Sequence, residues 1–298
     1  MRVWLDRTEV TGLCTRVTVD KEAAAAGAEA EVVLVCAPMD SRLPRLDPAC
    51  GQWITLRQDE ELLFTGRVEQ VSYDAARLAL TLLCFDPASL LAKNQCRGPW
   101  RGTPASITRQ LCQLCGLEPG DIWEGDGQEV YLSAACGRSC YRTIRSLYDD
   151  ACVVEYSDGR VNLYPMGARQ AVLSSGQLVG LTARNSAQEA VNRVRVYSNG
   201  QLAAQHTDEA GVLQLGLRSR DEYLSLQYAS AAQQAKAGVA GETRQARLTL
   251  TGRSPVKCGQ VVTLDRPLMG VYGRYLVTQV TWTCEKGLIT TELGVENL

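Results

Sequence analysis

The hydrophobic pattern over residues 1–96 is that of short strands joined by polar turns. Apolar and polar side chains alternate over 11–20, and an unbroken apolar run of strand length covers 31–38. Two further short segments follow at 51–56 and 78–82, with a polar turn after the first of them. Short segments at this spacing predict an antiparallel sandwich or barrel.

The pattern changes to helical spacing in the middle of the chain. Segment 104–116 places apolar residues on one helical stripe, with Thr103 as a suitable N-cap and Gly116 as the stop. A second helix is predicted over 139–151. Residues 97–168 are therefore expected to form a small α+β unit.

Two dipeptides predict tight hairpins. Asp158-Gly159 separates two apolar segments in the middle region, and Asn199-Gly200 follows the alternating segment 192–197. The last third is otherwise predicted to be β. One helix is predicted at 226–238, and further strands are predicted at 245–251, 260–264, 275–283 and 288–294.

The two β-rich regions repeat one another. The segment GQWITL (51–56) is matched by GQVVTL (259–264). Further matched segments are 66–68 with 273–275, 71–73 with 280–282, and 78–82 with 288–293. Two unrelated meanders could also share glycines and valines, but the identical G-Q-x-x-T-L opening favours duplication.

The predicted fold is mainly β with an α+β insert. Two antiparallel β-barrels, residues 1–96 and 169–298, are expected to flank the small α+β domain 97–168. A chain with two related modules suits an oligomer that imitates a higher symmetry, because three chains would present six similar modules around one axis.

The ordered set of segments resembles a known family. It comprises GQWITL, LFTGRVEQVSY, LTLLCFDPASLLAKN, RGTPASITRQLCQLCGL, NRVRV with its NG turn, and GQVVTLDRPLMGVYGRYLVTQVTW. The set is similar to the baseplate hub proteins of contractile phage tails and contractile injection systems (XkdQ-like, related to the late control protein D family). The similarity covers nearly the whole chain, although no single segment is diagnostic.

The resemblance implies a structural role without catalysis or cofactors. It implies that the two antiparallel β-barrels are tail-tube-like. It also implies a homotrimer with pseudo-sixfold symmetry that joins the sixfold tail tube to a threefold central spike. The partners expected are the tail tube or a tube-initiator protein, the spike protein, other baseplate proteins and the tape-measure protein. The expected location is the bacterial cytoplasm during assembly, and then the phage virion tail or the baseplate of an injection system.

Composition and charge exclude several other classes. The chain has 298 residues, 45% of them apolar, and a net charge of −2, which argues against a disordered chain and against a basic nucleic-acid-binding surface. No segment approaches the roughly 20 apolar residues of a membrane helix. The first residues carry charges and no apolar core, so a secretory signal is not expected.

Cysteine is the strongest chemical candidate. The chain has 12 cysteines, and without an export signal we expect reduced thiols that pack in the core. Cys112-x-x-Cys115 and Cys136-x-x-x-Cys140 could instead hold a structural zinc ion through four thiolates. The extra residue in the second pair and the position of Cys115 on an apolar helical stripe favour packing.

The residues needed for catalysis are scarce. His206 is the only histidine, and no G-x-S-x-G nucleophile segment accompanies it, so a solvated histidine is expected. The candidate carboxylate pairs are Asp59-Glu60-Glu61, Asp149-Asp150 and Glu124 with Asp126. A glycosidase needs two carboxylates across a cleft with one raised pKa. These groups read instead as solvated turns and helix ends.

Two further possibilities concern the arginines of one predicted strand and other functions that a β-barrel could have. Arg193 and Arg195 share a strand face opposite Val194 and Val196, where they could line a lumen or a subunit contact. A tail-associated peptidoglycan hydrolase, or a barrel that binds polysaccharide or nucleic acid, are the competing functions. The lack of nucleophile motifs opposes the first, and balanced charge with 6% aromatic residues opposes the second.

Overall fold

The computed structural model describes residues 1–37, 39, 41–59, 61–132, 138–173, 178–224, 230–266 and 271–298. Contacts divide them into two compact units. The larger unit comprises Met1–Leu181, Arg247–Leu264 and Arg274–Val295, and the smaller unit comprises Thr182–Ala246, Asp265–Gly273 and Glu296–Leu298.

The larger unit is dominated by one curled sheet of 13 strands. Its first strands are β1 (Arg2–Leu5), β2 (Thr8–Glu9), β3 (Cys14–Glu22), β4 (Glu29–Val35), β5 (Trp53–Gln58), β6 (Glu61–Asp74) and β7 (Ala79–Phe85). Its later strands are β13 (Gln170–Ala171), β14 (Leu178–Ser186), β18 (Thr243–Thr251), β19 (Val261–Arg266), β20 (Val271–Glu285) and β21 (Leu288–Asn297).

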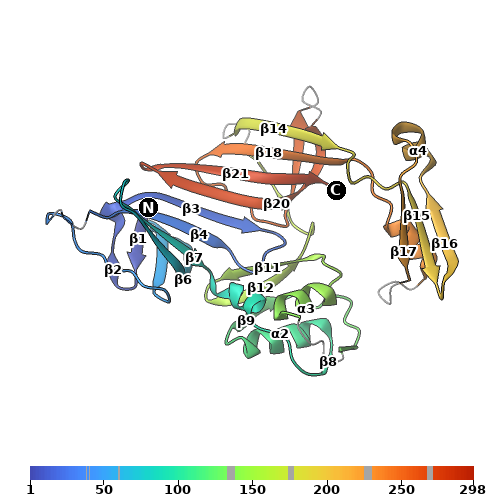
Figure 1. The fold of residues 1–298 in the computed structure, drawn as a ribbon, viewed down its shortest axis with the longest axis horizontal. Coiled ribbons are helices and arrows are strands. Elements are labelled where there is room, and N and C mark those ends of the chain that lie inside the picture. The colour runs from blue at the N-terminus through green and yellow to red at the C-terminus, as the bar shows by residue number, and fades with distance from the viewer. Residues whose placement is uncertain are drawn as a thin grey trace. The chain divides into compact units, whose positions relative to one another are not determined.

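The strands of both β-rich regions lie side by side in this sheet (Figure 1). Their order is β14-β18-β21-β20-β3-β4-β7-β6-β5-β1-β2, and β19 pairs with β20 and β13. The mainly β fold predicted from the sequence is confirmed, and it takes the form of one continuous curled sheet. Alternation is the cause, because each strand turns one set of apolar side chains to the inner face.

The α+β insert adds helices and two small sheets to the larger unit. Its helices are α2 (Pro104–Leu114) and α3 (Cys140–Leu147). The 3₁₀ turn η2 (Pro87–Ser89) and helix α1 (Leu90–Lys93) precede it in the chain, and another 3₁₀ turn, η1 (Thr11–Leu13), precedes β3. Its strands are β8 (Trp100–Gly102), β9 (Glu118–Ile122), β10 (Val130–Leu132), β11 (Cys152–Ser157) and β12 (Arg160–Pro165). β10 pairs with β8, and β11-β12-β9 form a second small sheet.

The helix signals read from the sequence are confirmed for α2. The Thr103 hydroxyl accepts a hydrogen bond from the Ser106 amide, Pro104 is the first helical residue, and Gly116 follows at φ +71°. Helix α3 begins after Ser139 as predicted but ends at Leu147, before the expected 151. Asp149 and Asp150 have φ of +48° and +60°, which an α-helix cannot contain.

Both hairpin predictions are confirmed. Asp158 and Gly159 have positive φ between β11 and β12, as Asn199 and Gly200 have between β15 (Arg193–Ser198) and β16 (Gln201–Thr207). Strands β15 and β16 belong to the smaller unit, together with α4 (Glu209–Leu215), β17 (Ser219–Tyr223) and α5 (Ala231–Ala237). The predicted helix at 226–238 therefore begins at Ala231, and residues 225–229 lie outside the described residues.

The smaller unit has its own small core. Val194 and Val196 of β15 are fully buried against Ala235 of α5. The strand order is β16-β15-β17, with β15 and β17 parallel. The opposite face of β15 carries Arg193 and Arg195, as the alternation predicted.

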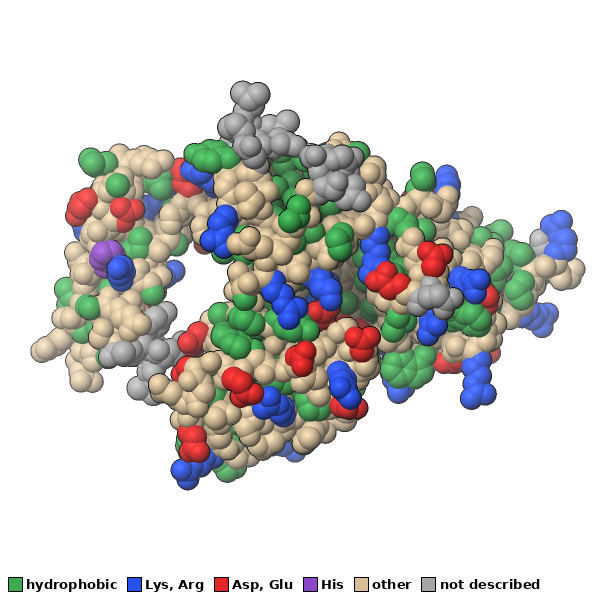
Figure 2. All heavy atoms as spheres, turned by 180° about the vertical axis from the view of Figure 1, so that it is seen from behind, with side chains coloured by type: hydrophobic (Ala, Val, Ile, Leu, Met, Phe, Trp, Pro, Cys, Tyr) green, Lys and Arg blue, Asp and Glu red, His purple; other side chains and the backbone are tan. Residues whose placement is uncertain are grey.

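Charged side chains of both signs are mixed on one face of the molecule. On the face shown in Figure 2, basic and acidic groups lie interspersed and form no single patch of one sign. In the described part of the chain, no helix has the length and apolarity needed to cross a membrane.

Candidate assembly interface

The sheet contains one five-stranded module twice. The first module, β3, β4, β5, β6 and β7, has the spatial order β3-β4-β7-β6-β5. The second, β14, β18, β19, β20 and β21, has the order β14-β18-β21-β20-β19. If the strands of each module are numbered 1 to 5 along the chain, both modules have the spatial order 1-2-5-4-3. Residues 187–242 of the smaller unit are inserted in the chain between β14 and β18, the first two strands of the second module.

The G-Q opening of the first module forms a defined turn. The Gly51 amide donates to the Val68 carbonyl (2.7 Å), and the Val68 amide donates to the Gln52 carbonyl (2.8 Å). The Gln52 side-chain oxygen accepts from the Ala49 amide at 2.8 Å. Gly51 has φ +94°, which explains why glycine stands there.

The second module repeats these bonds. The Gly259 amide donates to the Val277 carbonyl (2.8 Å), and the Val277 amide donates to the Gln260 carbonyl (2.8 Å). The Gln260 side-chain oxygen accepts from the Lys257 amide at 3.0 Å, and Gly259 has φ +77°. Matching strand order and matching hydrogen bonds support the duplication that the sequence repeat indicated.

One matched segment of the sequence repeat is out of register by two residues. Because Val68 and Val277 make the same bonds, Gly66 corresponds to Tyr275 and not to Gly273. The ring of Phe64 lies over Gly66, whereas Tyr275 is itself buried. The sequence repeat matched Gly66-Arg67 with Gly273-Arg274 because the residues are identical, but identity at two positions does not determine which backbone groups pair.

The two modules join edge to edge within the chain. Residues 279–285 of β20 pair antiparallel with residues 16–22 of β3. Trp282 lies opposite Val19, and both belong to the core of the first module, as does Cys284. Apolar burial therefore continues across the junction.

Polar groups on the other face hold the register of this junction. The Asp20 carboxylate accepts hydrogen bonds from the Gln279 side-chain amide (2.9 Å) and from the Thr281 hydroxyl. The Thr18 and Thr283 hydroxyls lie 3.4 Å apart. Such cross-strand pairs fix which residues face one another.

Each module also has an open edge among the described residues. Residues 70–74 of β6 pair with β7 on one side, but no described strand pairs with them on the other. β14 is the last strand at its end of the sheet. Unpaired edges invite a further strand and are normally covered or protected in soluble proteins.

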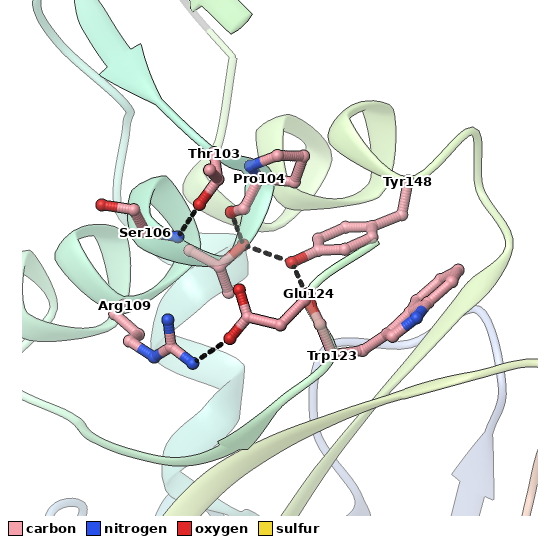
Figure 3. Close-up of polar contacts among 8 residues, drawn as sticks. Thr103, Pro104, Ser106, Arg109, Trp123, Glu124 and Tyr148 are labelled. Carbon is pink, nitrogen blue, oxygen red and sulfur yellow. Dashed lines mark hydrogen bonds and ion pairs between the residues drawn. The ribbon is translucent and has the colours of Figure 1, made fainter. Parts of the chain in front are cut away.

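The α+β insert is organised around Tyr148 (Figure 3). The Tyr148 hydroxyl donates to the Trp123 carbonyl (2.8 Å), and its ring stacks on Trp123 with centroids 5.2 Å apart. The Thr108 hydroxyl donates to the Pro104 carbonyl (2.8 Å) and lies 3.4 Å from the Tyr148 oxygen. Burial raises the pKa of Tyr148 to about 12, so this network is structural at neutral pH.

Three of the four cysteines proposed as zinc ligands lie in the core of the insert. Cys112, Cys115 and Cys140 are buried there, and Cys96 joins them. Burial raises the pKa of Cys112 and of Cys140 to about 12, which disfavours thiolates. Cys136 lies outside the described residues, and the described residues contain no group of three or more ligands placed to hold a metal ion.

The candidate catalytic residues lie on different elements of the fold. His206 lies on β16, opposite Val194 of β15. Glu124 pairs with Arg109 at 2.7 Å, as Figure 3 shows.

The other carboxylate pairs lie at turns. Asp150 pairs with Arg145 at 2.8 Å, beside Asp149. Glu61 pairs with Arg253 at 2.6 Å near the hairpin tip at Asp59, and Asp126 accepts from the Gln128 amide. Glu60 lies outside the described residues.

The two arginines of β15 also have polar partners. Arg195 makes a two-pronged pair with Asp221 (2.7 and 3.0 Å), and Arg193 donates to the Thr207 hydroxyl at 3.3 Å. These bonds tie β15 to both of its neighbours, β16 and β17.

A cavity of about 420 Å³ in the larger unit was not foreseen from the sequence. Lys21 and Asp86 lie on its wall. The Lys21 ammonium donates to the Ala25 carbonyl (3.1 Å), and Asp86 accepts from the Ala28 amide (2.8 Å). Burial lowers the pKa of Lys21 and raises the pKa of Asp86. Sequence position gave no sign of this, because the two residues meet only in the folded sheet.

Known structures share this fold at low sequence identity. The 43 kDa tail protein of prophage MuSo2 from Shewanella oneidensis is 14% identical, with a TM-score of 0.77 over 99% of this chain and 96% of that chain. The tail protein from Neisseria meningitidis MC58 is 12% identical, with a TM-score of 0.70 over 99% and 95%. Prophage tail protein gp18 from Listeria monocytogenes EGD-e is 12% identical, with a TM-score of 0.63 over 95% and 88%.

Comparison of the sequence itself gives the family. No curated protein sequence matches the chain significantly. A family model described as YQBQ-like matches residues 19–296. Since that match spans nearly the whole length, the chain belongs to the YQBQ-like family.

Proposed function

We propose that this protein is the structural hub of a baseplate in a contractile phage tail or a related injection machine. It acts as a homotrimer with pseudo-sixfold symmetry and joins a sixfold tail tube to a threefold central spike. The observation that carries the proposal is the duplicated module, two copies of one five-stranded unit joined through β3 and β20.

The duplication suits a symmetry adaptor. A tube of six equal subunits offers six equal contacts, whereas a trimeric spike offers three. Three copies of a two-module chain present six similar modules to the tube but remain three chains toward the spike. The insert and the smaller unit occur once per chain, so they would give the assembly its threefold face.

Proteins of similar fold support this role. They include the phage tail proteins described above and E. coli c3393, a type VI secretion component described as similar to the T4 tail proteins gp27 and gp5 (TM-score 0.57, 9% identical). A similar chain in a Francisella PdpA–VgrG complex has a TM-score of 0.60. On this basis the partners proposed are a tube or tube-initiator protein, a spike protein and other baseplate proteins.

A structural role also accommodates the side chains of the catalytic candidates. The carboxylates of Glu61, Glu124 and Asp150 are engaged in ion pairs with arginines. The hydrogen bond from Arg253 lowers the pKa of Glu61, whereas a general acid needs a raised pKa. We therefore propose a non-enzymatic protein that acts in the virion tail or the baseplate after assembly in the bacterial cytoplasm.

The molar mass in solution tests the proposal. Light scattering should give a particle near three times 32.5 kDa, and electron microscopy along its axis should show six lobes. A strict monomer that cleaves peptidoglycan would instead establish the hydrolase alternative. His206→Ala should leave the mass unchanged, since the histidine has no assembly role in this scheme.

A further inference from the structure

The junction inside the chain shows how one module receives the next. After its pairing with β19, strand β20 continues and takes β3 as its partner over residues 279–285. Since Val68 corresponds to Val277, the equivalent stretch of the first module is residues 70–74 of β6. This is the stretch whose outer edge is open among the described residues.

Strand β14 holds the place in the second module that β3 holds in the first. The Cys36 amide, just past β4, donates to the Leu78 carbonyl at 2.8 Å. The Gly252 amide, just past β18, donates to the Ile289 carbonyl at 2.8 Å. These equal bonds place β4 and β18 in equivalent positions, residue by residue.

The same reasoning gives the register of β14. Three residues before the two amides stand Val33 in β4 and Thr249 in β18. Arg16 of β3 lies opposite Val33. A Cβ on Gly180 would lie 3.2 Å from the Cβ of Thr249, so Gly180 lies opposite Thr249 and corresponds to Arg16. Leu181 and Ala183 then correspond to the buried Val17 and Val19 of β3.

The apolar faces at both open edges are exposed where their counterparts are buried. Val179, Leu181 and Ala183 alternate along β14, and Ala183 is exposed, whereas its counterpart Val19 is only 5% exposed. On β6, Tyr73 is 46% exposed, whereas its counterpart Trp282 is 8% exposed beneath β3. A strand with an inward-facing apolar pattern at a bare edge indicates a missing neighbour.

We propose that the ring closes by antiparallel pairing of β14 from one copy with residues 70–74 of β6 from the next copy. The pairing repeats the register of β20 with β3, and it rests on the proposed trimeric hub. All six junctions of the ring are then built alike: three lie within chains through β3 and β20, and three lie between chains through β14 and β6.

This register brings complementary residues together. Tyr73 lies opposite Ala183 of the neighbouring copy, as Trp282 lies opposite Val19, and the aromatic side chain of Tyr73 covers the alanine. Ser72 lies opposite Arg184, and Arg184 is diagonal to Asp74, within reach of a cross-strand ion pair. The carboxylate that fixes the internal junction, Asp20, is thus replaced by a basic residue.

Charge substitutions at the proposed contact test the inference. Tyr73→Asp and Ala183→Asp each place an unpaired charge in a buried strand contact. Each should raise the protein concentration at which the trimer half dissociates by more than about a hundredfold. The double variant Tyr73→Asp, Ala183→Lys should restore the trimer, because the two charges then face one another across every copy-to-copy contact.

Matched controls separate this contact from general effects of charge. Tyr131→Asp and Ala203→Asp change exposed strand residues away from both edges and should leave the trimer intact. Both edge variants should have the Tm of wild-type protein diluted until its trimer has dissociated, because assembly itself raises Tm. If both edge variants still form a trimer as stable as that of the wild type, the proposed pairing is overturned but the proposed hub is not. A wild-type chain that stays monomeric at every concentration overturns both.

Discussion

Gly66 offers the sharpest test of how the first module packs. The glycine lies in β6 opposite Ile54, where the second module has Tyr275. A Cβ added to Gly66 would lie 2.5 Å from the Phe85 carbonyl oxygen and 2.6 Å from Cζ of Phe64. Real Cβ atoms essentially never approach other atoms closer than 3.0 Å, so Gly66→Ala must displace something.

The magnitude follows from what can move. The Phe85 oxygen is backbone in β7, which is paired on both sides by β4 and β6, so it cannot yield without breaking ladder bonds. The Phe64 ring could rotate away, but it is buried and would lose its apolar contacts. Overpacking of this kind costs about 1–3 kcal/mol, and the rigid neighbour places Gly66→Ala near 3 kcal/mol.

Thermal unfolding measures this loss. For a unit of this size, about 3 kcal/mol corresponds to a Tm roughly 6–12 °C lower. Gly12→Ala is the matched control, because no atom lies within 4 Å of its added Cβ, and its Tm should change little. A Gly66→Ala protein with an unchanged Tm would refute the packing argument.

Two further predictions concern charge and hydrogen bonding. The pKa of Glu29 is raised above its ordinary value. Burial is the larger cause, and the nearby carboxylates Asp20, Glu31 and Glu22 add to it. Because the pKa of Glu29 is higher in the folded protein than in the unfolded chain, the ionised carboxylate destabilises the fold at neutral pH, whereas below the unfolded-state pKa the carboxyl is neutral in both states. Glu29→Gln should therefore raise Tm at pH 7 but not below about pH 4. An equal effect at both pH values would contradict this. Tyr148→Phe leaves the Trp123 carbonyl without its donor and should cost about 1–2 kcal/mol in urea unfolding with the fold unchanged by circular dichroism; a neutral result would mean that the hydroxyl contributes nothing.

Local signals in the sequence were sufficient for the elements themselves. Thr103, Pro104 and Gly116 mark the ends of α2 because capping and backbone preference act within a few residues. Asp158-Gly159 and Asn199-Gly200 mark hairpins because type I′ turns need positive φ at both positions. The G-Q repeat was also visible, since each copy must form the same turn with the same glycine and glutamine.

Only the tertiary structure decided how these elements combine. Pairing of Trp282 with Val19 merges both β-rich regions into one sheet, and no local signal encodes a partner that is more than 250 positions away. The register shift at Gly66, the approach of Lys21 and Asp86 to one cavity, and the insertion of the smaller unit are of the same kind. The sequence determined turns, caps and the duplicated module, because those depend on neighbours along the chain. The fold decided which edges are joined and which stay open, because strand pairing depends on neighbours in space.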